Sequence, residues 1–352
     1  MLLEFKTKNY KSFVEEASFS MVAAPKQKGL DYSLMKTKIK GKEIKGLSSS
    51  VIYGPNAAGK TNIIGAMDVL RSIVLRGNIR NSEEKSSPNP AASALELIPN
   101  NNESEAKPVC FEIEFYEEDG EEHKFKIHYK LKIDLGTFLE EEYQRKILAE
   151  VLEVNGERVF ERREGLKVEN LKVIKDYLSD ITEQNAGSIN EIAKNSLNQE
   201  ELFLTNGFKL IFSPKFTKLI VDWFANKFMV IYRADSMQLI KRFADPKKKA
   251  VYVEKTTDEA AKLFGINSNA IGYVVSDDEP DAKLYSIFKN MKDQKTTAIA
   301  ADIFESYGTI RFINMFPLVI KAMQTGGTLV VDEFDASIHP MALMSIINVF
   351  HN

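Results

Sequence analysis

The feature that most constrains this fold is a glycine-rich loop at residues 54–61, with the sequence Gly54-Pro55-Asn56-Ala57-Ala58-Gly59-Lys60-Thr61. Its spacing, GxxxxGK(S/T), lets backbone N–H groups turn inward around a phosphate, while the following helix presents its positive N-terminus. Lys60 is then placed to reach the β- and γ-phosphates of a nucleotide, and the hydroxyl of Thr61 to bind Mg²⁺. An apolar run over 50–53 predicts a strand before the loop, and helical spacing of apolar residues over 62–76 predicts a helix after it. The sequence therefore predicts a strand, loop and helix in which Gly54 to Asn62 bind a nucleotide.

A second signal lies near the end of the chain, where the apolar run 328–331 is followed by Asp332 and Glu333. A buried strand beside the phosphate loop would hold Asp332 against the Mg²⁺ ion through its water shell. Glu333, one residue further, can orient or deprotonate an attacking water. We therefore expect Lys60 and Glu333 to be catalytic, and Thr61 and Asp332 to hold the metal. An exposed acidic turn at the end of a strand is the alternative interpretation of this segment.

A third signal is the segment Glu305-Ser306-Tyr307-Gly308-Thr309, which precedes a predicted helix over 310–323. Ser306 and Gly308 at the start of a helix form a second anion site, since hydroxyl, N–H groups and helix dipole all face one phosphate. One chain needs one such site for each nucleotide, so the second site is expected to serve the nucleotide of a partner subunit. A simple helix N-cap is the alternative interpretation.

Composition limits the classes of protein that remain. No apolar run of about 18 residues occurs and no signal peptide is recognisable, so we expect a cytoplasmic protein with no membrane partner. The single cysteine, Cys110, excludes a disulfide framework and a thiolate metal site. A net charge of −3 argues against a surface coated with basic residues for nucleic acid. The cluster Lys241-Arg242 with Lys247-Lys248-Lys249 is one local basic patch, and a solvated loop is its alternative interpretation.

The order of patterns along the chain predicts an α/β protein in three parts. Residues 1–167 hold the phosphate loop and an antiparallel meander of strands over 109–163, with an Asn155-Gly156 turn. The polar stretch 78–107 is predicted to be a surface loop and a site of disorder. Residues 168–300 are predicted to be a mainly helical insertion, and 301–352 to hold the segments around Ser306 and Asp332.

Four segments together carry a family resemblance: Asn9-Tyr10-Lys11-Ser12-Phe13, the loop at 54–61, the segment at 305–309, and the run from Asp332 to Pro340. The combination resembles ABC-type ATPase heads of the SMC, RecF and OLD kind, and most of all the small ATP-binding proteins of bacterial phage-defence (abortive-infection) operons. The resemblance implies a P-loop NTPase of ABC-head type with an antiparallel β lobe and a helical insertion, using ATP and Mg²⁺. It also implies that Ser306 and Gly308 contact the γ-phosphate of ATP held by the opposite subunit, with residues 335–339 passing between the two sites.

The resemblance also implies roles for Lys11 and His339, and it names two family features that this sequence does not show. Lys11 is expected near the nucleotide, with a surface lysine as the alternative. His339 matches a Ser-x-His-Pro turn that opens the next helix, so its role is expected to be structural. The family also has a switch histidine on a strand beyond Asp332 and a Q-loop glutamine; the sequence ends at Asn352 before such a strand, and no glutamine occurs between Lys60 and Lys107. We therefore expect a form truncated before the switch-histidine strand, with weak turnover and retained ATP binding.

The function that this resemblance implies is an ATP-hydrolysing protein that dimerises, or forms a higher oligomer, around ATP and regulates a separate toxin or nuclease effector in antiviral defence. The alternative is a RecF-like DNA-repair ATPase that binds duplex DNA directly, so DNA is a further candidate partner. An ABC transporter subunit would have a shorter lobe between the loop and the signature, with LSGGQ-like wording. A P-loop kinase would leave residues 305–309 unexplained.

Overall fold

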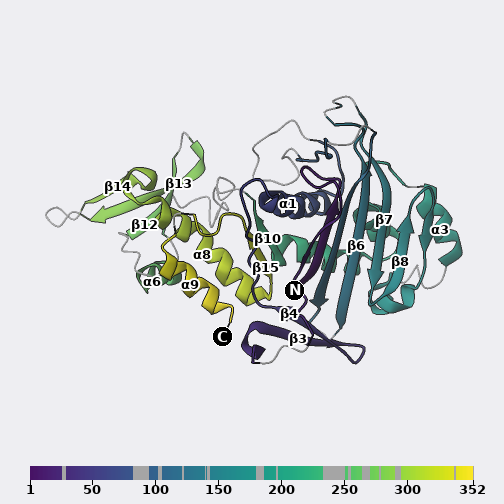
Figure 1. Cartoon of the computed structure of the whole chain (residues 1–352), viewed down its shortest axis with the longest axis horizontal. Coiled ribbons are helices and arrows are strands. Elements are labelled where there is room, and N and C mark those ends of the chain that lie inside the picture. The colour runs from purple at the N-terminus through teal and green to yellow at the C-terminus, as the bar shows by residue number, and fades with distance from the viewer. Residues whose placement is uncertain are drawn as a thin grey trace. The chain divides into compact units, whose positions relative to one another are not determined.

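The chain forms two compact units in a computed structural model that describes residues 1–25, 29–81, 95–101, 105–120, 123–138, 140, 143–179, 186–195, 197–232, 250–252, 255–263, 270–276, 279–289, 295–336 and 338–351. Unit 1 comprises Met1–Tyr232 and Gly326–Val330, and unit 2 comprises Arg233–Thr325 and Val331–Asn352 (Figure 1). The predicted boundaries at 167/168 and 300/301 are therefore not the boundaries between compact units. Sequence patterning locates elements, whereas contacts between distant segments decide which elements pack together.

Unit 1 is built on a seven-stranded antiparallel sheet with the order β2-β1-β5-β6-β7-β8-β9. The antiparallel meander predicted over 109–163 forms its centre. In β5 and β6, every second side chain is buried, as expected of strands with one face on the core. Asn155 and Gly156 both have positive φ (54° and 83°), which suits the tight turn between β7 and β8. The strands are β1 (Leu2–Lys8), β2 (Ala17–Ser20), β5 (Val109–Glu118), β6 (Lys124–Asp134), β7 (Lys146–Val154), β8 (Glu157–Arg162) and β9 (Leu166–Val168).

Helical segments cover the apolar face of this sheet. The α1 helix (Lys60–Arg76) has ten buried residues, of which eight belong to the hydrophobic core, and aromatic residues of later segments complete that core. Trp223 stacks on Phe115 of β5 at 3.8 Å between ring centroids and also on Phe228 at 5.0 Å. The remaining elements are η1 (Asp31–Ser33), β3 (Leu34–Ile39), β4 (Lys42–Leu47), η2 (Leu171–Tyr177), α3 (Ala186–Asn195), η3 (Leu204–Phe208), α4 (Lys209–Ile211), α5 (Pro214–Asp222), η4 (Trp223–Lys227) and β10 (Phe228–Ile231).

A buried charged group joins the sheet to the chain after residue 197. Glu150 of β7 is fully buried and accepts hydrogen bonds from the backbone N–H groups of Phe203 (2.7 Å) and Leu204 (2.9 Å) and from the Tyr129 hydroxyl (2.9 Å). Arg162 lies 3.8 Å from the Glu150 carboxylate and donates to the carbonyl of Glu201 at 2.6 Å. Burial raises the pKa of Glu150, while the hydrogen bonds and Arg162 oppose that rise. The carboxylate therefore fixes the start of η3 against the sheet.

The strand predicted before the phosphate loop is absent, which corrects that expectation. Residues 51–54 have no strand conformation and form no ladder with the described strands. Val51 is 73% exposed and Tyr53 is 90% exposed, so this apolar run has not found a buried partner. An apolar run forms a strand only where another strand pairs with it, and no described strand pairs with residues 51–54. In the described part of unit 1, β10 pairs with β15 (Thr328–Val331) as a separate two-stranded sheet.

Unit 2 contains a second antiparallel sheet, with the order β11-β12-β13-β14. Its strands are β11 (Ala250–Tyr252), β12 (Ala270–Ser276), β13 (Glu279–Lys289) and β14 (Thr296–Ala300). The prediction that 168–300 is mainly helical is therefore wrong for these four strands, in which Ile, Val, Tyr and Phe favour strand structure once neighbouring strands are present. The helices of this unit are α6 (Lys255–Leu263), α7 (Ala301–Phe304), α8 (Tyr307–Thr325) and α9 (Pro340–Val349).

Two sequence predictions concern residues outside the described part of the chain. The basic cluster from Lys241 to Lys249 lies there, as does the segment 82–94 within the predicted surface loop.

Candidate functional site

The phosphate loop turns sharply before α1 and encloses the ammonium of its own lysine. Ala57 and Gly59 adopt positive φ angles of 64° and 91°, which redirect the backbone twice within three residues. The Nζ atom of Lys60 donates hydrogen bonds to the carbonyl oxygens of Gly54 and Pro55, both at 2.8 Å. The chain from Gly54 to Ala58 is exposed to solvent. The loop therefore holds one positive charge within an open turn at the N-terminus of a helix, an arrangement suited to an anion.

The α1 helix holds this loop against the core. Its buried residues include Ile63, Ile64, Met67 and Leu70, which recur at the spacing of one helical face. Its C-terminus ends at Gly77, whose positive φ of 74° and N–H bond to the carbonyl of Ile73 (2.9 Å) close the last turn. Packing of α1 on the core therefore fixes the helix N-terminus at Lys60, while the preceding loop stays exposed to solvent.

The N-terminal turn at residues 9–13 lies directly against the phosphate loop, a contact that the sequence patterns did not predict. Asn62 Nδ2 donates to Ser12 Oγ at 2.7 Å. A Cβ atom at Gly59 would lie 2.9 Å from Cε1 of Phe13, so the aromatic ring packs on the glycine itself. The resemblance pointed to this segment through Lys11, but Ser12 and Phe13 are the residues that contact the loop.

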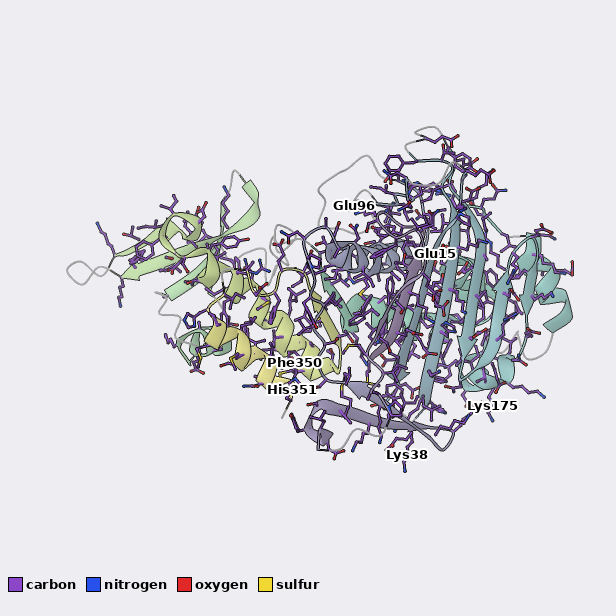
Figure 2. The ribbon with its side chains drawn as sticks, in the orientation of Figure 1. Glu15, Lys38, Glu96, Lys175, Phe350 and His351 are labelled. Carbon is purple, nitrogen blue, oxygen red and sulfur yellow. The ribbon has the colours of Figure 1, made fainter. Side chains whose placement is uncertain are left out.

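The side chain of Lys11 is engaged away from the loop. Its Nζ atom pairs with Glu96 at 2.6 Å and donates to the Tyr232 hydroxyl at 3.0 Å. Tyr232 in turn packs on Gly65 of α1, where a Cβ would meet its ring at 2.9 Å, and Figure 2 labels Glu96 near this helix. A role for Lys11 at the nucleotide remains a proposal that requires this pair to open.

Asp332 and Glu333 follow β15 directly. Asp332 is 7% exposed, and its Oδ1 atom accepts the backbone N–H of Glu333 at 3.1 Å. Glu333 has an exposed side chain and a positive φ of 50°, a left-handed conformation that is unfavourable for a residue with a Cβ. The carboxylate predicted to face the metal is thus buried, and the carboxylate predicted to activate water is free to face solvent.

Ser306 caps helix α8, as in the alternative interpretation of its segment. Its Oγ atom accepts the N–H of Thr309 at 3.1 Å and lies 2.9 Å from the Thr309 hydroxyl. Ser306 and Tyr307 are exposed, Gly308 is half-buried, and Glu305 is tied to β13 by a 2.7 Å hydrogen bond from Ser286. The N-terminus of α8 is therefore exposed and positioned by the sheet of unit 2. A cap of this kind does not by itself exclude a phosphate partner.

His339 opens helix α9, and its predicted structural role is confirmed. Its Nδ1 atom accepts the N–H of Met341 at 3.2 Å, and Pro340 follows as the first helical residue. Asp335 is exposed and lies in the same turn region, whereas Ser337 is outside the described residues.

Comparison with family models supplies the identification. Residues 49–352 match the family described as "AAA domain, putative AbiEii toxin, Type IV TA system". The chain belongs to this family. The match spans the phosphate loop, the segment at Ser306 and the pair Asp332-Glu333, and it confirms the predicted resemblance to ATP-binding proteins of abortive-infection type. The family is one of P-loop ATPases, which bind ATP with Mg²⁺. A search of curated proteins gave no match.

Membrane-spanning helices and clusters of metal-binding side chains are both absent from the described residues. Among the described residues, no helix is both long and apolar enough to cross a membrane. No group of three or more His, Cys, Asp or Glu side chains in the described ranges is arranged to hold a metal ion by itself.

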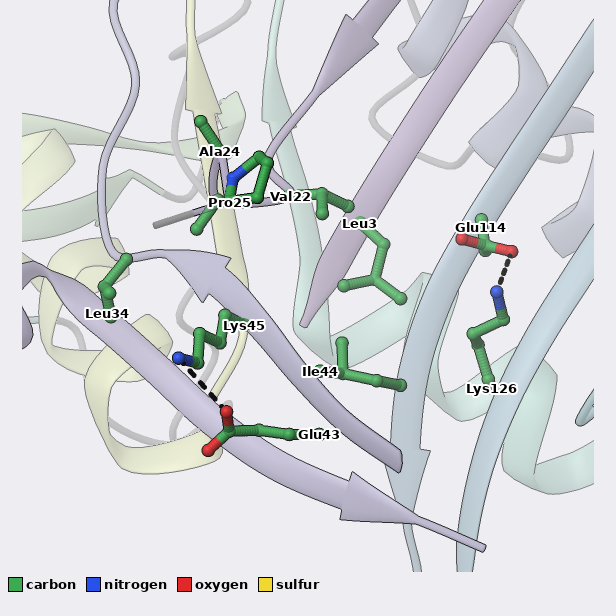
Figure 3. A pocket seen from close by; sticks show the side chains of 11 residues that line it. Leu3, Val22, Ala24, Pro25, Leu34, Glu43, Ile44, Lys45, Glu114 and Lys126 are labelled. Atoms are coloured by element: carbon green, nitrogen blue, oxygen red, sulfur yellow. Dashed lines mark ion pairs between the residues drawn. The ribbon is translucent and has the colours of Figure 1, made fainter. Parts of the chain in front are cut away.

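A cavity of about 390 Å³ in unit 1 lies away from the phosphate loop. It is lined by the start of β1, the β3–β4 hairpin and the strands β5 and β6. Figure 3 shows two ion pairs in its wall, Lys45–Glu43 at 3.1 Å and Lys126–Glu114 at 2.7 Å. None of the residues 54–62 is among those that line it, so this cavity is not the nucleotide site.

Proposed function

We propose that this family member binds MgATP at residues 54–62 and hydrolyses it. The observation that carries the proposal is the position of Lys60, whose ammonium already lies in the open loop on the carbonyls of Gly54 and Pro55. Nucleotide phosphates would replace these two carbonyls as acceptors, and the loop N–H groups and the α1 dipole would add to the attraction. Under this proposal, residues Gly54, Pro55, Asn56, Ala57, Ala58, Gly59, Lys60, Thr61 and Asn62 contact ATP.

The chemical step assigns separate tasks to the remaining residues. Thr61 and Asp332 would hold Mg²⁺, which would neutralise charge on the phosphates. Glu333 orients a water and takes its proton as the oxygen attacks the γ-phosphorus. The bond from the γ-phosphorus to the bridging oxygen breaks, and ADP and inorganic phosphate are released. The exposed Glu333 side chain beside buried Asp332 supports this division between a base and a metal ligand.

We further propose that the fold is of ABC-head type and that two copies close around two ATP molecules. Support comes from the exposed N-terminus of α8, a 19-residue helix whose first turn carries Ser306 and Gly308. Ser306 Oγ would exchange its bond with the Thr309 N–H for the γ-phosphate of the other copy's ATP. The turn at 335–339 would then pass between the two sites, and hydrolysis would reopen the dimer.

In the cell, we propose that this cycle regulates a separate effector, a toxin or nuclease, in antiviral defence in the cytoplasm. The family's description names a toxin of a type IV system, which supports a defence-related setting. The alternative of direct binding to DNA depends on the basic cluster at Lys241–Lys249, which lies outside the described residues.

The test is the solution mass of Glu333→Gln by light scattering, with and without MgATP. This substitution keeps the site but removes the proton acceptor, so a closed dimer should accumulate. We expect the mass to double only with ATP, and Lys60→Met and Ser306→Arg, each added to Glu333→Gln, to abolish the doubling for different reasons. Lys60→Met should lose ATP binding, whereas Ser306→Arg should retain it. A mass that ATP does not change, in a protein shown to bind ATP, would contradict the two-copy mechanism.

A further inference from the structure

A buried arginine on helix α8 is bonded to the backbone of the two carboxylate residues. Arg311 is only 2% exposed, and its Nη2 group donates to the carbonyl oxygen of Asp332 at 3.1 Å and also to that of Glu333. Both acceptors are main-chain carbonyls, so Arg311 holds the path of the backbone through these two residues and does not contact their carboxylates. Arg311, Asp332 and Glu333 all belong to unit 2.

The turn that Arg311 holds is strained at Glu333. The positive φ of 50° at this residue is rarely adopted when a Cβ is present, and surrounding contacts must maintain it. Three contacts do so. The N–H of Glu333 is bonded to Asp332 Oδ1 at 3.1 Å, its carbonyl accepts the N–H of Ala336 at 3.0 Å, and the same carbonyl accepts from Arg311. Of these, only Arg311 comes from a different element of the fold.

Burial of the Arg311 guanidinium costs free energy unless hydrogen bonds or a counter-ion replace its lost hydration. Among the described residues, its Nε and Nη1 atoms have no hydrogen-bond partner, and no carboxylate forms an ion pair with it. A buried charge without a counter-ion is unfavourable, and an apolar side chain of similar length would avoid that penalty. Packing of α8 does not by itself explain why an arginine stands at this site.

The position of Arg311 in α8 links the turn at Glu333 to Ser306, the residue proposed to contact the ATP of the other copy. Arg311 lies five residues after Ser306, less than one and a half turns along the same helix. The helix is also bonded to the sheet of unit 2 further along, because Tyr273 of β12 donates to Asn314, the eighth residue of α8, at 2.8 Å. The helix is therefore a short rigid connection between the segment at Ser306 and the backbone of Glu333.

We propose that Arg311 is a positioning residue that holds Glu333 in its left-handed turn and ties that turn to the N-terminus of α8. This inference rests on the proposed function, because it assigns Arg311 to the chemistry of Glu333. A phosphate that docks on Ser306 moves or steadies α8, and Arg311 passes that change to the carbonyl of Glu333. Phosphate binding at Ser306 is thereby coupled to the position of Glu333 through the first turns of α8 and the guanidinium of Arg311.

The experiment compares Arg311→Met and Arg311→Lys with the wild-type chain. Methionine keeps a stem of similar length without donors, while lysine restores a charge and donors in a more compact group without the planar fork. Lys321→Met is the matched control, because it removes a cation from the same helix at a half-buried site. Each protein is assayed for steady-state ATP hydrolysis, for ATP affinity, and for amide hydrogen exchange in the peptide that covers 332–336.

If Arg311 positions Glu333, Arg311→Met should lower kcat about tenfold or more while the ATP dissociation constant stays within about twofold. Arg311→Lys should recover part of kcat. Exchange of the amides at 333–336 should become about tenfold faster in Arg311→Met and stay unchanged in Lys321→Met, with peptides of unit 1 as an internal reference. Unchanged exchange and unchanged kcat in Arg311→Met, in a folded protein, would overturn the proposal. A uniform rise in exchange over all of unit 2 would also overturn it, because that result indicates a general packing role.

The two proposals fail in distinguishable ways. If the wild-type chain does not hydrolyse ATP or does not dimerise with it, the proposed function fails, whereas the hydrogen-exchange comparison still reports whether Arg311 holds the turn. If hydrolysis and dimerisation are present and Arg311→Met leaves kcat intact, the proposed function stands and the role of Arg311 fails.

Discussion

The ring of Phe13 packs on Gly59 so closely that a Cβ atom at position 59 would lie 2.9 Å from its Cε1 atom. Residue 13 belongs to the turn after β1, whereas residue 59 is the last residue of the phosphate loop before α1. A hydrogen bond of 2.7 Å from Asn62 to Ser12 joins the same two segments. The loop is therefore supported from outside by the N-terminal turn, and five predictions follow from the contacts that position the loop or stabilise unit 1.

Gly59→Ala should both strain and displace the loop. The φ of 91° is unfavourable for alanine, and the added methyl collides with Phe13, so we expect a loss of about 2–3 kcal/mol of stability and a marked loss of ATP affinity. Gly41→Ala is the matched control, because its φ of 78° carries strain while nothing lies within 4 Å of the added Cβ. Chemical denaturation and calorimetric ATP titration measure both effects. Phe13→Ala added to Gly59→Ala should recover part of the loss, and equal losses for Gly41→Ala and Gly59→Ala would refute the contact.

Lys60→Met should weaken ATP binding without destabilising the folded chain. Charge-assisted hydrogen bonds from the ammonium to phosphate contribute about 1.5–3 kcal/mol, so ATP affinity should fall by about 10- to 100-fold. Stability of the ligand-free chain should change by less than about 1 kcal/mol, because Lys60 bonds only to two carbonyls in an exposed loop. The exposed Lys209→Met serves as the control. Retention of wild-type affinity in Lys60→Met would show that the loop is not the nucleotide site.

His128 should make unit 1 more stable at acidic than at alkaline pH. Desolvation lowers its pKa, but hydrogen bonds to Glu112 (2.7 Å) and Glu153 (3.1 Å) outweigh it and raise the pKa above the ordinary 6.5. A raised pKa adds stability that is complete below about 6.5 and disappears as pH rises through the folded value. His128→Gln should therefore cost about 1 kcal/mol more at pH 6 than at pH 9, after allowance for solvent screening. Urea denaturation at the two pH values measures this, and a cost that grows with pH would be inconsistent with the ion pairs.

The ion pair between His128 and Glu112 also predicts that unit 1 loses stability at acidic pH, because of the lowered pKa of Glu112. The hydrogen bond from His128 lowers the pKa of Glu112 to about 2 from its ordinary 4.5, with further help from Lys130. A lowered pKa adds stability that is present above 4.5 and is lost as pH falls towards 2. Glu112→Gln should therefore flatten the loss of stability below pH 4.5, and a parallel acid limb in the variant would contradict this assignment.

Glu150→Ala should be among the most damaging substitutions in unit 1. It removes the acceptor of two backbone N–H groups and leaves Arg162 buried without its carboxylate, so we expect a loss of about 3–5 kcal/mol. Adding Arg162→Met should recover part of that loss, because the unpaired charge is then gone. Denaturant unfolding of both single variants and the double variant measures the coupling. Strictly additive losses would show that the two side chains act independently.

Local signals explain what could be predicted from the sequence. The helix after Lys60 was predicted because its apolar residues recur at helical spacing, and the turn at Asn155-Gly156 because both residues tolerate positive φ. His339 was placed at the start of a helix through the resemblance to a Ser-x-His-Pro turn, and it does precede α9. The strand expected at 50–53 is absent, since an apolar run forms a strand only where another strand pairs with it. The four strands of unit 2 were missed for the same reason, because β pairing depends on distant partners.

The sequence by itself determined the candidate site residues: a lysine in a glycine loop, two carboxylates after an apolar run, and a serine–glycine helix start, each encoded by adjacent residues. Only the tertiary structure decided that Phe13 and Ser12 support the loop, that Glu150 fastens η3, and that Arg311 holds the backbone of Glu333. Glycine torsion angles and helical periodicity act within a few residues, so they are visible in the sequence. Burial and long-range hydrogen bonds join residues tens or hundreds of positions apart, so folding alone brings them together.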